Sequence, residues 1–374
     1  MTVAVYGAAG HLGRLVVTEL SQRKYPLVLS GRDREKLASL GDYDGLAVIR
    51  EARVVDGGVS PHVFDDCQVV INCAAPLAEL GGPVAVAAIN ADAHYLDPAG
   101  QQAYIHDFIT RFDESARLRG VAAIPACGFD YALGDCLVRL TADSGETARK
   151  ITVAYALAGQ DVRHNSLRGA VGSDNRGEVV YQAGRWRPAH WGRVSRARFT
   201  FPSGPRTVTR YGSGEVVTVP RHTPTASVES FITVAALSPH PLLTPFFPYL
   251  RPAAAGLLRT PARQWLGALA QRVGHRGPPA TDAAAGTDAA GTDAADPASD
   301  FEIGVVATYP TARRAAFLSG MHTQRLTAVI LANATDRMLA PGFQRTGALT
   351  PAMAFEPGEF LDALTAHGIG WRRE

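Results

Sequence analysis

The chain has 374 residues, of which 46% are hydrophobic, and a formal net charge of +2. A chain of this length predicts two domains, and its balanced charge, without a basic tail, argues against nucleic acid as a partner. No apolar run has the length that a membrane span needs, and the first strand pattern starts at Thr2, which leaves no room for a signal peptide. We therefore expect a cytoplasmic protein.

Short apolar runs alternate with helical patterns over the first part of the chain. Strands interleaved with helices in this way predict an α/β fold with a doubly wound parallel sheet. We assign residues 1–148 to this Rossmann domain. The expected strands are 2–7, 26–31, a segment within 47–56, 68–76 and 121–128, and the expected helices are 11–23, 33–40, 83–92 and 101–119.

The pattern changes near residue 148. Up to about residue 235, apolar residues alternate in short runs, one of which is EVVTVP at 215–220. Such alternation is typical of an antiparallel sheet with one wet face. Residues 149–321 are therefore expected to form a second α+β domain with a mostly antiparallel sheet. In the closing segment, 322–374, helices are expected around 322–340 and 357–367.

Two stretches of the second part have a different composition. Residues 241–273 are apolar and interrupted by prolines, which predicts short helices over the core, with a cover over a substrate tunnel or a dimer surface as alternatives. Residues 277–300 repeat TDAA three times and lack large apolar side chains. Such a segment cannot bury enough surface to offset its ordering entropy, so we expect a disordered insert.

The segment GAAGHLGR follows the first strand and opens the first helix. Its glycines are spaced G-x-x-G-x-x-G, which allows a tight turn and lets main-chain N–H groups approach a pyrophosphate at the helix N-terminus. We therefore expect a dinucleotide site. The contacts expected from this loop are Gly7, Ala9, Gly10, His11, Leu12 and Gly13.

The end of the second strand indicates which dinucleotide binds. Ser30 and Gly31 stand where a ribose-binding acid would be expected, and Arg32 follows them. A guanidinium group can pair with a 2′-phosphate, so this pattern favours NADP(H) over NAD(H) as the cofactor. The alternative is that Arg32 is a solvated surface residue. Asp33 is expected to cap the next helix.

Further cofactor contacts are expected after the third and fourth strands. Asp56 either approaches the adenine or caps a turn. The segment NCAAP ends the fourth strand, where a doubly wound sheet binds its ligand, and its small residues let the backbone come close. The residues expected at the cofactor are Cys73, Ala74, Ala75 and Pro76.

Several segments, in order, resemble one protein family. The segments VYGAAGHLGRLV, LSGRDREKL, VVINCAAPLAELGGPVAVAAINADAHYLDPAGQ and PACGFDYALGD are similar to the saccharopine dehydrogenase-like NADP-binding oxidoreductases, which include trans-acting enoyl reductase-like proteins. Later segments, such as GSGEVVTVPRH and LTPAMAFEPGEFLDALTAHGIGW, also look like this family. The resemblance covers most of the chain except 241–300. It implies a Rossmann domain, a mostly antiparallel second domain, and C-terminal helices that pack back onto the first.

Two departures from the family pattern concern the substrate. The family usually reads Gly-Phe-Asp-Ser-x-Pro at its opening motif, whereas here Tyr131 replaces the serine and Leu133 the proline. A glycine- and threonine-rich loop is also expected early in the second domain, but residues 164–173 read HNSLRGAVGS.

A nicotinamide reductase needs a group that stabilises or protonates its product. No tyrosine has a lysine four positions on, which excludes the Tyr-x-x-x-Lys route, and the sequence predicts no metal site. The candidates for the chemistry are Tyr131, Asp130, His164 and Arg168.

These candidates have different alternatives. The Tyr131 phenol could donate to a developing anion. Asp130 either caps the next helix or acts as an acid, and His164 and Arg168 either contact substrate or lie on a solvated loop.

Three neighbouring groups are expected to be structural. Asp135 is predicted to be an exposed helix residue, and Asp97 to cap a turn, with a role in orienting the nicotinamide as its alternative. Cys127 is expected to be packed, like the other three cysteines Cys67, Cys73 and Cys136, which lie in or beside apolar runs with no C-x-x-C pair.

The sequence therefore predicts an NADPH-dependent reductase that transfers hydride to a polarised double bond of a small molecule. An imine (C=N) of an amino-acid-derived or secondary-metabolite substrate is preferred, because Arg168 could hold a carboxylate. The alternatives are an enoyl (C=C) reductase for an acyl or polyketide-type substrate and a non-catalytic NADP-binding regulator or scaffold. Whether the protein forms a homodimer stays open.

Overall fold

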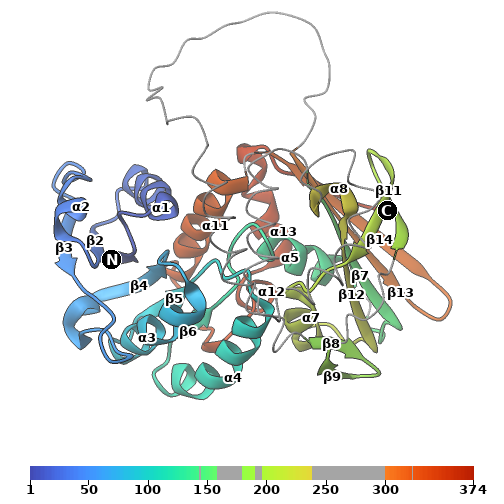
Figure 1. Ribbon diagram of the computed structural model, residues 1–374, viewed down its shortest axis with the longest axis horizontal. Coiled ribbons are helices and arrows are strands. Elements are labelled where there is room, and N and C mark those ends of the chain that lie inside the picture. Colours follow the sequence, from blue (N-terminus) through green and yellow to red (C-terminus); the bar gives the residue numbers. More distant parts are fainter. Residues whose placement is uncertain (143–144, 158–178, 190–195, 238–299, 322) are drawn as a thin grey trace, which may run out of the picture.

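The computed structural model describes residues 1–142, 145–157, 179–189, 196–237, 300–321 and 323–374. Its N-terminal half is built on a parallel sheet with the strand order β15-β6-β5-β4-β1-β2-β3, so the predicted doubly wound parallel sheet is confirmed (Figure 1). The strands are β1 (Thr2–Tyr6), β2 (Leu27–Gly31), β3 (Ala47–Glu51), β4 (Cys67–Asn72), β5 (His94–Leu96), β6 (Ala122–Ile124) and β15 (Gly347–Ala348).

Alternating side chains of β1 enter two different cores, because successive residues of a strand point to opposite faces. Val3 and Val5 pack in the core that contains α1, whereas Ala4 and Tyr6 pack in the core that contains α3 and α4. Helices therefore cover both faces of the sheet, which explains why the strand is apolar throughout. The helices of this half are α1 (His11–Gln22), α2 (Arg34–Ala38), α3 (Leu77–Asn90), α4 (Gln102–Leu118) and α5 (Ala132–Thr141).

The second sheet has nine strands within the described ranges and the main order β10-β11-β12-β7-β13-β14-β16, with β8 and β9 added beside β12. Only β12 and β7 pair in parallel there, so the prediction of a mostly antiparallel sheet is confirmed. The strands are β7 (Lys150–Leu157), β8 (Val179–Gln182), β9 (Arg185–Pro188), β10 (Arg196–Phe201), β11 (Gly204–Arg210), β12 (Ser227–Thr233), β13 (Phe301–Thr308), β14 (Arg313–Gly320) and β16 (Gly370–Arg373), and α8 (Val234–Leu237) follows β12.

The prediction of a strand at 215–220 was wrong. These residues form α7 (Glu215–Thr218) and the 3-10 helix η2 (Val219–Arg221). Pro220 lies in the first turn of η2, where its missing N–H breaks no helical hydrogen bond. A run this short has no period that separates helix from strand, so the burial of its valines decided the outcome.

Helix α3 begins before the predicted start at 83 and contains Pro83. Gly81, Gly82 and Pro83 disfavour a helix locally. The packing of α3 against α4 requires a glycine at position 81. A Cβ atom at Gly81 would lie 2.1 Å from the Tyr104 hydroxyl oxygen, so the close contact depends on the missing side chain.

The C-terminal segment contributes to both sheets as well as forming helices. Helix α11 (Thr323–Met338) lies beside α1, where Asp336 pairs with the Arg23 guanidinium at 3.0 Å. Figure 1 shows α11 and α13 (Pro357–Asp362) between the two sheets. The strands β15 and β16 were not predicted, because two to four residues are too few to show a period. The remaining elements are α12 (Pro351–Ala354), η1 (Pro61–Phe64) and η4 (Thr365–His367).

None of the helices in the described part of the chain is long and apolar enough to cross a lipid bilayer.

Candidate active site

The glycine loop between β1 and α1 is shaped by close backbone contacts. Gly7 has a φ of +81°, and a Cβ atom there would lie 2.7 Å from the main-chain nitrogen of Ala74. A Cβ atom at Gly13 would lie 2.2 Å from the Gly7 carbonyl oxygen. No side chain caps α1 at Gly10, and the first N–H groups of a helix have no acceptor within it. The loop therefore fits the pyrophosphate of a dinucleotide.

The segment after β4 faces this loop. The buried Asn72 side chain accepts a hydrogen bond from the Ala74 N–H at 3.0 Å and donates one to the Tyr95 hydroxyl at 3.1 Å, which fixes the turn. Burial raises the pKa of the Cys73 thiol to about 12, so this thiol stays neutral. The residues that follow, Ala75 and Pro76, are exposed. The structure thus brings Gly7 of the loop against Cys73 and Ala74 of the second segment.

Ser30 acts on the glycine loop through its main chain. Its carbonyl oxygen accepts hydrogen bonds from the N–H groups of Gly7 at 2.8 Å and Ala8 at 3.2 Å. Its side chain is fully buried, and the Oγ atom has no partner among the described residues. Arg32, two residues on, is exposed. Asp33 caps α2 by accepting from the Lys36 N–H at 3.1 Å, as predicted.

Arg53 is a candidate that the sequence did not indicate. Its Nε donates to the Arg32 carbonyl oxygen at 3.0 Å and lies 3.7 Å from a carboxylate oxygen of Glu51. Because β2 and β3 are parallel and pair Gly31 with Glu51, both arginines emerge at the same edge of the sheet. A prediction that β2 and β3 are adjacent in the sheet would have indicated Arg53, because it follows β3 as Arg32 follows β2.

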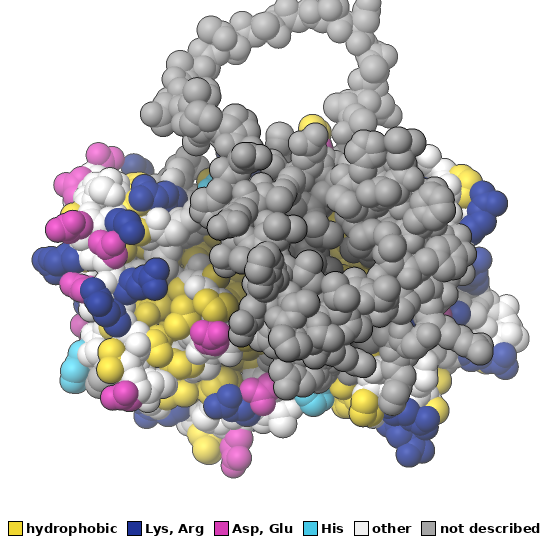
Figure 2. All heavy atoms as spheres, in the orientation of Figure 1, with side chains coloured by type: hydrophobic (Ala, Val, Ile, Leu, Met, Phe, Trp, Pro, Cys, Tyr) yellow, Lys and Arg dark blue, Asp and Glu magenta, His cyan; other side chains and the backbone are white. Residues whose placement is uncertain are grey.

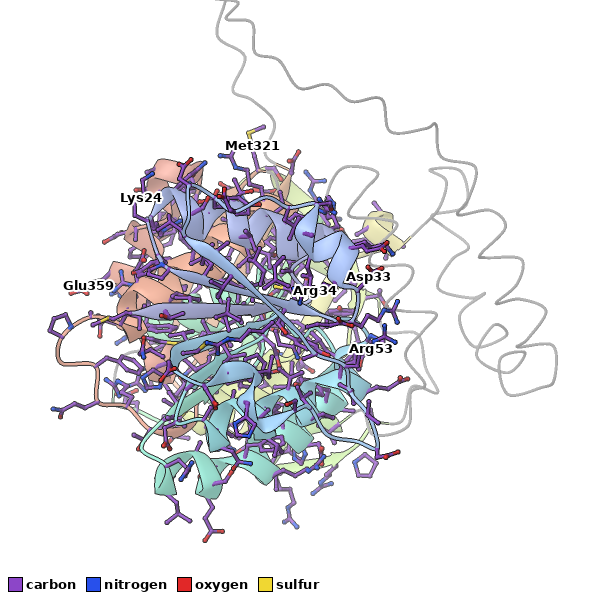
Figure 3. All side chains as sticks on the ribbon, turned by 90° about the vertical axis from the view of Figure 1, so that its left-hand side faces the viewer. Lys24, Asp33, Arg34, Arg53, Met321 and Glu359 are labelled. Atoms are coloured by element: carbon purple, nitrogen blue, oxygen red, sulfur yellow. The ribbon has the colours of Figure 1, made fainter. Side chains whose placement is uncertain are left out.

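Figure 3 shows Asp33, Arg34 and Arg53 together on one side of the Rossmann half, opposite Lys24, which precedes β2. On the face shown in Figure 2, Lys and Arg side chains lie at the left, over this half, with Asp and Glu among them, and also at the right and lower edges. Arg32, Arg34 and Arg53 thus lie at the edge that follows β2 and β3.

Three further residues predicted for the site, Asp56, His164 and Arg168, are not among the residues described so far. Asp56 is exposed in a tight turn, with a φ of +50°, in which Val55 and Gly58 exchange hydrogen bonds of 2.9 Å. His164 and Arg168 lie outside the described residues, as do 241–273 and nearly all of 277–300.

Tyr131 is almost completely buried at the start of α5. Its hydroxyl group donates to the Gly100 carbonyl oxygen at 2.9 Å and lies 3.3 Å from the Tyr211 hydroxyl. Burial raises its pKa well above the ordinary value. As a proton donor, Tyr131 would first have to leave the Gly100 carbonyl.

Part of the Asp130 residue reaches solvent, while protein atoms surround its carboxyl group. A Cβ atom at Gly100, in the loop after β5, would lie 3.1 Å from its Oδ2. Asp130 caps no helix, because Tyr131 holds the N-cap position of α5 and no side chain caps that helix. Desolvation by the surrounding protein raises the pKa of Asp130 to about 6. A carboxyl group with this pKa can both give and accept a proton near neutral pH.

The expectation that Asp135 is exposed was wrong. It is fully buried, because it lies on the face of α5 that packs against η2 and α12. The structural roles expected for two other groups are confirmed. Asp97 is fully buried and accepts from the Ala99 N–H at 2.9 Å, and Cys127 is a buried thiol.

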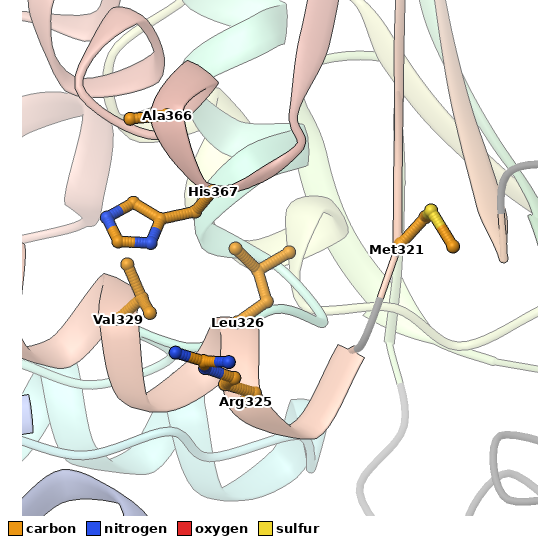
Figure 4. A pocket seen from close by; sticks show the side chains of 6 residues that line it. All are labelled: Met321, Arg325, Leu326, Val329, Ala366 and His367. Atoms are coloured by element: carbon orange, nitrogen blue, oxygen red, sulfur yellow. The ribbon is translucent and has the colours of Figure 1, made fainter. Parts of the chain in front are cut away.

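A cavity of about 240 Å³ lies elsewhere, between the start of α11 and η4 (Figure 4). None of the predicted site residues lines it. Among the described residues, no group of three or more His, Cys, Asp or Glu side chains could hold a metal ion. The residues around the cavity are Met321, Arg325, Leu326, Val329, Ala366 and His367.

Comparisons with known proteins point to one family. The chain is 27% identical over 151 residues to a human saccharopine dehydrogenase-like oxidoreductase, covering 36% of this chain and 35% of that protein. It is 29% identical over 145 residues to the lipid droplet localized protein of Caenorhabditis elegans, covering 36% of this chain and 34% of that protein. The matched part thus spans about a third of the length of these relatives. No protein-family model matches the chain.

The fold has a solved counterpart. Apo saccharopine dehydrogenase (L-Glu forming) from Saccharomyces cerevisiae superposes with a TM-score of 0.59 over 100% of this chain and 99% of that one, at 12% identity. This similarity in fold covers both the parallel sheet and the second sheet. The chain is thus similar in sequence, over about a third of its length, to saccharopine dehydrogenase-like oxidoreductases, and similar in fold to a saccharopine dehydrogenase.

Proposed function

We propose that the protein is an NADPH-dependent oxidoreductase that reduces a polarised double bond of a small molecule. The observation that supports this most strongly is the position of Asp130 relative to the glycine loop. Both follow strands of one parallel sheet at their carboxyl ends, where such sheets bind ligands. A cofactor cradle and a carboxyl group with a pKa of about 6 therefore share one edge.

The cofactor preference depends on charge. Arg32 and Arg53 emerge side by side, and Ser30 stands where NAD-binding domains place an acid. Asp33 is already paired with Lys36 at 3.1 Å. A 2′-phosphate is therefore expected to bind between the two guanidinium groups, with the glycine loop and the 73–76 turn holding the rest of NADPH.

Asp130 suits the reduction of an imine. Bound NADPH would supply the hydride that adds to the carbon of the C=N bond. Asp130, in its acid form, would give its proton to the nitrogen, and the resulting carboxylate would stabilise the iminium cation beside it. Solvent then returns a proton to Asp130. The same carboxylate would oppose the negative charge that develops when an enoyl thioester is reduced, so we rank the enoyl reductase second.

The other predicted groups keep supporting roles in this proposal. Tyr131 holds the Gly100 loop, and His164 and Arg168 are kept as substrate-binding candidates. A cytoplasmic location and a homodimer remain predictions.

The experiment is a turnover assay with NADPH and two panels, cyclic imines and enoyl thioesters, followed by the loss of NADPH absorbance. Each imine is offered with and without a carboxylate. Turnover of imines alone supports the proposal, and turnover of enoyl thioesters alone replaces it with the second candidate. Tight NADPH binding without turnover of either panel indicates a regulator or scaffold. Failure to bind NADPH would refute the cofactor assignment itself.

A further inference from the structure

A second carboxyl group lies behind the turn that carries Asp130. Glu215, the first residue of α7, is fully buried, and its Oε1 is hydrogen-bonded to the Tyr155 hydroxyl of β7. The Tyr155 hydroxyl also lies 2.7 Å from the main-chain carbonyl oxygen of Asp130. A side chain of the second domain thus reaches the backbone of the proposed catalytic residue.

The hydrogen count at Tyr155 constrains this arrangement. A tyrosine hydroxyl has one hydrogen to donate, yet two oxygens lie within its reach. Both contacts are hydrogen bonds only if Glu215 supplies a second hydrogen. Glu215 then donates to the Tyr155 oxygen, and Tyr155 donates to the carbonyl of Asp130.

The surroundings favour a neutral Glu215. Burial raises its pKa to about 8, and its Oε2 has no hydrogen-bond partner among the described residues. An ionised carboxylate would leave an unpaired charge in this site. The negative charge of Asp135 adds to the effect of burial, whereas hydrogen bonds from Ser213, from Tyr155 and from the main chain of Glu215 itself act in the opposite direction and do not outweigh burial.

The cluster has no room to rearrange. A Cβ atom at Gly134 of α5 would lie 2.3 Å from Glu215 Oε1 and 2.5 Å from the Tyr155 hydroxyl oxygen. A Cβ atom at Gly214 would lie 2.6 Å from the Tyr131 ring. Gly214 and Glu215 therefore pack closely against Tyr131 and Gly134, at the start of α5.

We propose that Glu215 and Tyr155 are positioning residues for Asp130: neutral Glu215 donates to Tyr155, and Tyr155 holds the Asp130 carbonyl, which sets the direction of the Asp130 carboxyl group. This inference rests on the proposed function for its catalytic consequence, but the hydrogen-bond chain itself is independent of any substrate. When Glu215 ionises above about pH 8, it takes the Tyr155 hydrogen, and the Asp130 carbonyl loses its donor.

The test combines two variants with two matched controls. Glu215→Gln keeps a neutral donor, and Tyr155→Phe breaks the chain. Glu302→Gln replaces another buried glutamate, hydrogen-bonded to Ser203, and Tyr309→Phe replaces another buried tyrosine that donates to a main-chain carbonyl, that of Ala142 at 3.3 Å. Carboxyl carbon NMR gives the pKa values of Glu215 and Asp130 without a substrate, and turnover over a pH series gives the catalytic effect.

We expect Glu215 to be protonated at neutral pH. Tyr155→Phe should move the pKa of Asp130 toward the ordinary value of about 3.9 and lower kcat on the order of 10–100-fold with NADPH affinity unchanged. Glu215→Gln should keep the neutral-pH kcat and remove the further loss of activity above about pH 8, leaving only the decline that comes from Asp130. The two controls should change neither the Asp130 pKa nor kcat.

An ionised Glu215 at neutral pH would overturn the inference, and so would a Tyr155→Phe variant with an unchanged Asp130 pKa. If Tyr155→Phe does not fold, the titration of Glu215 in the unmodified protein and the pH profile of Glu215→Gln still decide. If no substrate is turned over, the proposed function fails, while the two carboxyl titrations continue to test the hydrogen-bond chain.

Discussion

The imidazole Nε2 of His222 lies 2.8 Å from Oδ1 of Asp135, in a part of the molecule where both side chains are buried. The other carboxylate oxygen of Asp135 accepts from the Ala352 N–H at 3.0 Å. Asp135 belongs to α5, His222 follows η2, and Ala352 belongs to α12. One carboxylate therefore connects the Rossmann half, the second domain and the C-terminal segment.

Asp135→Asn should destabilise the protein strongly. Removing the carboxylate leaves the buried His222 ring and the Ala352 N–H without their charged acceptor, and an unsatisfied buried group typically costs about 1–3 kcal/mol. We expect a loss of this size in the free energy of unfolding, measured by chemical denaturation. The control is Asp107→Asn, which breaks an exposed pair with Arg111 and should cost about 0–1 kcal/mol. Similar losses in both variants would contradict the role given to Asp135.

The same pair predicts a pH dependence of stability. Burial alone would raise the pKa of Asp135, but the charge of His222 and the hydrogen bonds from His222 and Ala352 hold it below its ordinary value. The contribution of Asp135 is therefore complete above the unfolded value of about 3.9 and is lost as the pH falls through the lower folded value. Denaturation curves recorded across this acidic range should show the loss in the unmodified protein and not in Asp135→Asn.

Asp130→Asn should separate catalysis from stability. Since desolvation raises the pKa of Asp130 to about 6, the acid form disappears as the pH rises through that value, and turnover should fall with it. The variant should no longer show this pH dependence. Its kcat should fall on the order of 100-fold or more. The raised pKa also means that Asp130 favours folding most below about pH 4 and that this contribution is lost as the pH rises through about 6. A neutral Asn should therefore not lower stability above that pH, and a large loss there would argue for a structural role.

Tyr131→Phe should have a mainly structural effect. The variant leaves the Gly100 carbonyl without its donor, which typically costs about 1–3 kcal/mol. Thermal unfolding should show this loss, whereas kcat should change less than in Asp130→Asn. A kcat loss in Tyr131→Phe as large as that of Asp130→Asn would instead assign the proton to the phenol.

Gly13→Ala should distort the cofactor cradle. Its Cβ atom would meet the Gly7 carbonyl oxygen at 2.2 Å, so α1 has to move away from β1, at a cost of about 1–3 kcal/mol. NADPH affinity, measured by fluorescence titration, should fall together with stability. Gly370→Ala is the control, because nothing lies within 4 Å of a Cβ atom there. Unchanged NADPH binding in Gly13→Ala would refute the proposed cradle.

The two arginines after β2 and β3 should determine the choice between the cofactors. Arg32→Ala and Arg53→Ala are each expected to weaken NADPH binding about tenfold or more and to leave NADH binding nearly unchanged, because only NADPH carries the 2′-phosphate. Arg34→Ala, an exposed arginine on the neighbouring α2, is the control. Calorimetry with each cofactor measures both binding affinities. Equal weakening of NADPH and NADH binding would contradict the assignment of NADPH as the preferred cofactor.

The parallel sheet and the glycine loop of the Rossmann half could be predicted from local sequence patterns. The spacing of Gly7, Gly10 and Gly13, and the apolar runs that became β1, β2 and β4, are properties of neighbouring residues, so the sequence by itself determined the parallel sheet and its glycine loop. The capping of α2 by Asp33 is equally local, since donor and acceptor are three residues apart. Such contacts form wherever the chain takes up the local structure.

Contacts between distant residues were decided only by the tertiary structure. Asp135 is buried because His222 and Ala352 lie against α5, 87 and 217 residues away along the chain. Arg53 reaches Arg32 because β2 and β3 pair in parallel, and Glu215 meets Asp130 through Tyr155 because the second sheet packs against α5. The sequence thus determined the cofactor loop, which uses short-range backbone geometry, whereas the environment of the proposed acid depends on desolvation and pairing by remote segments, which only the packed chain provides.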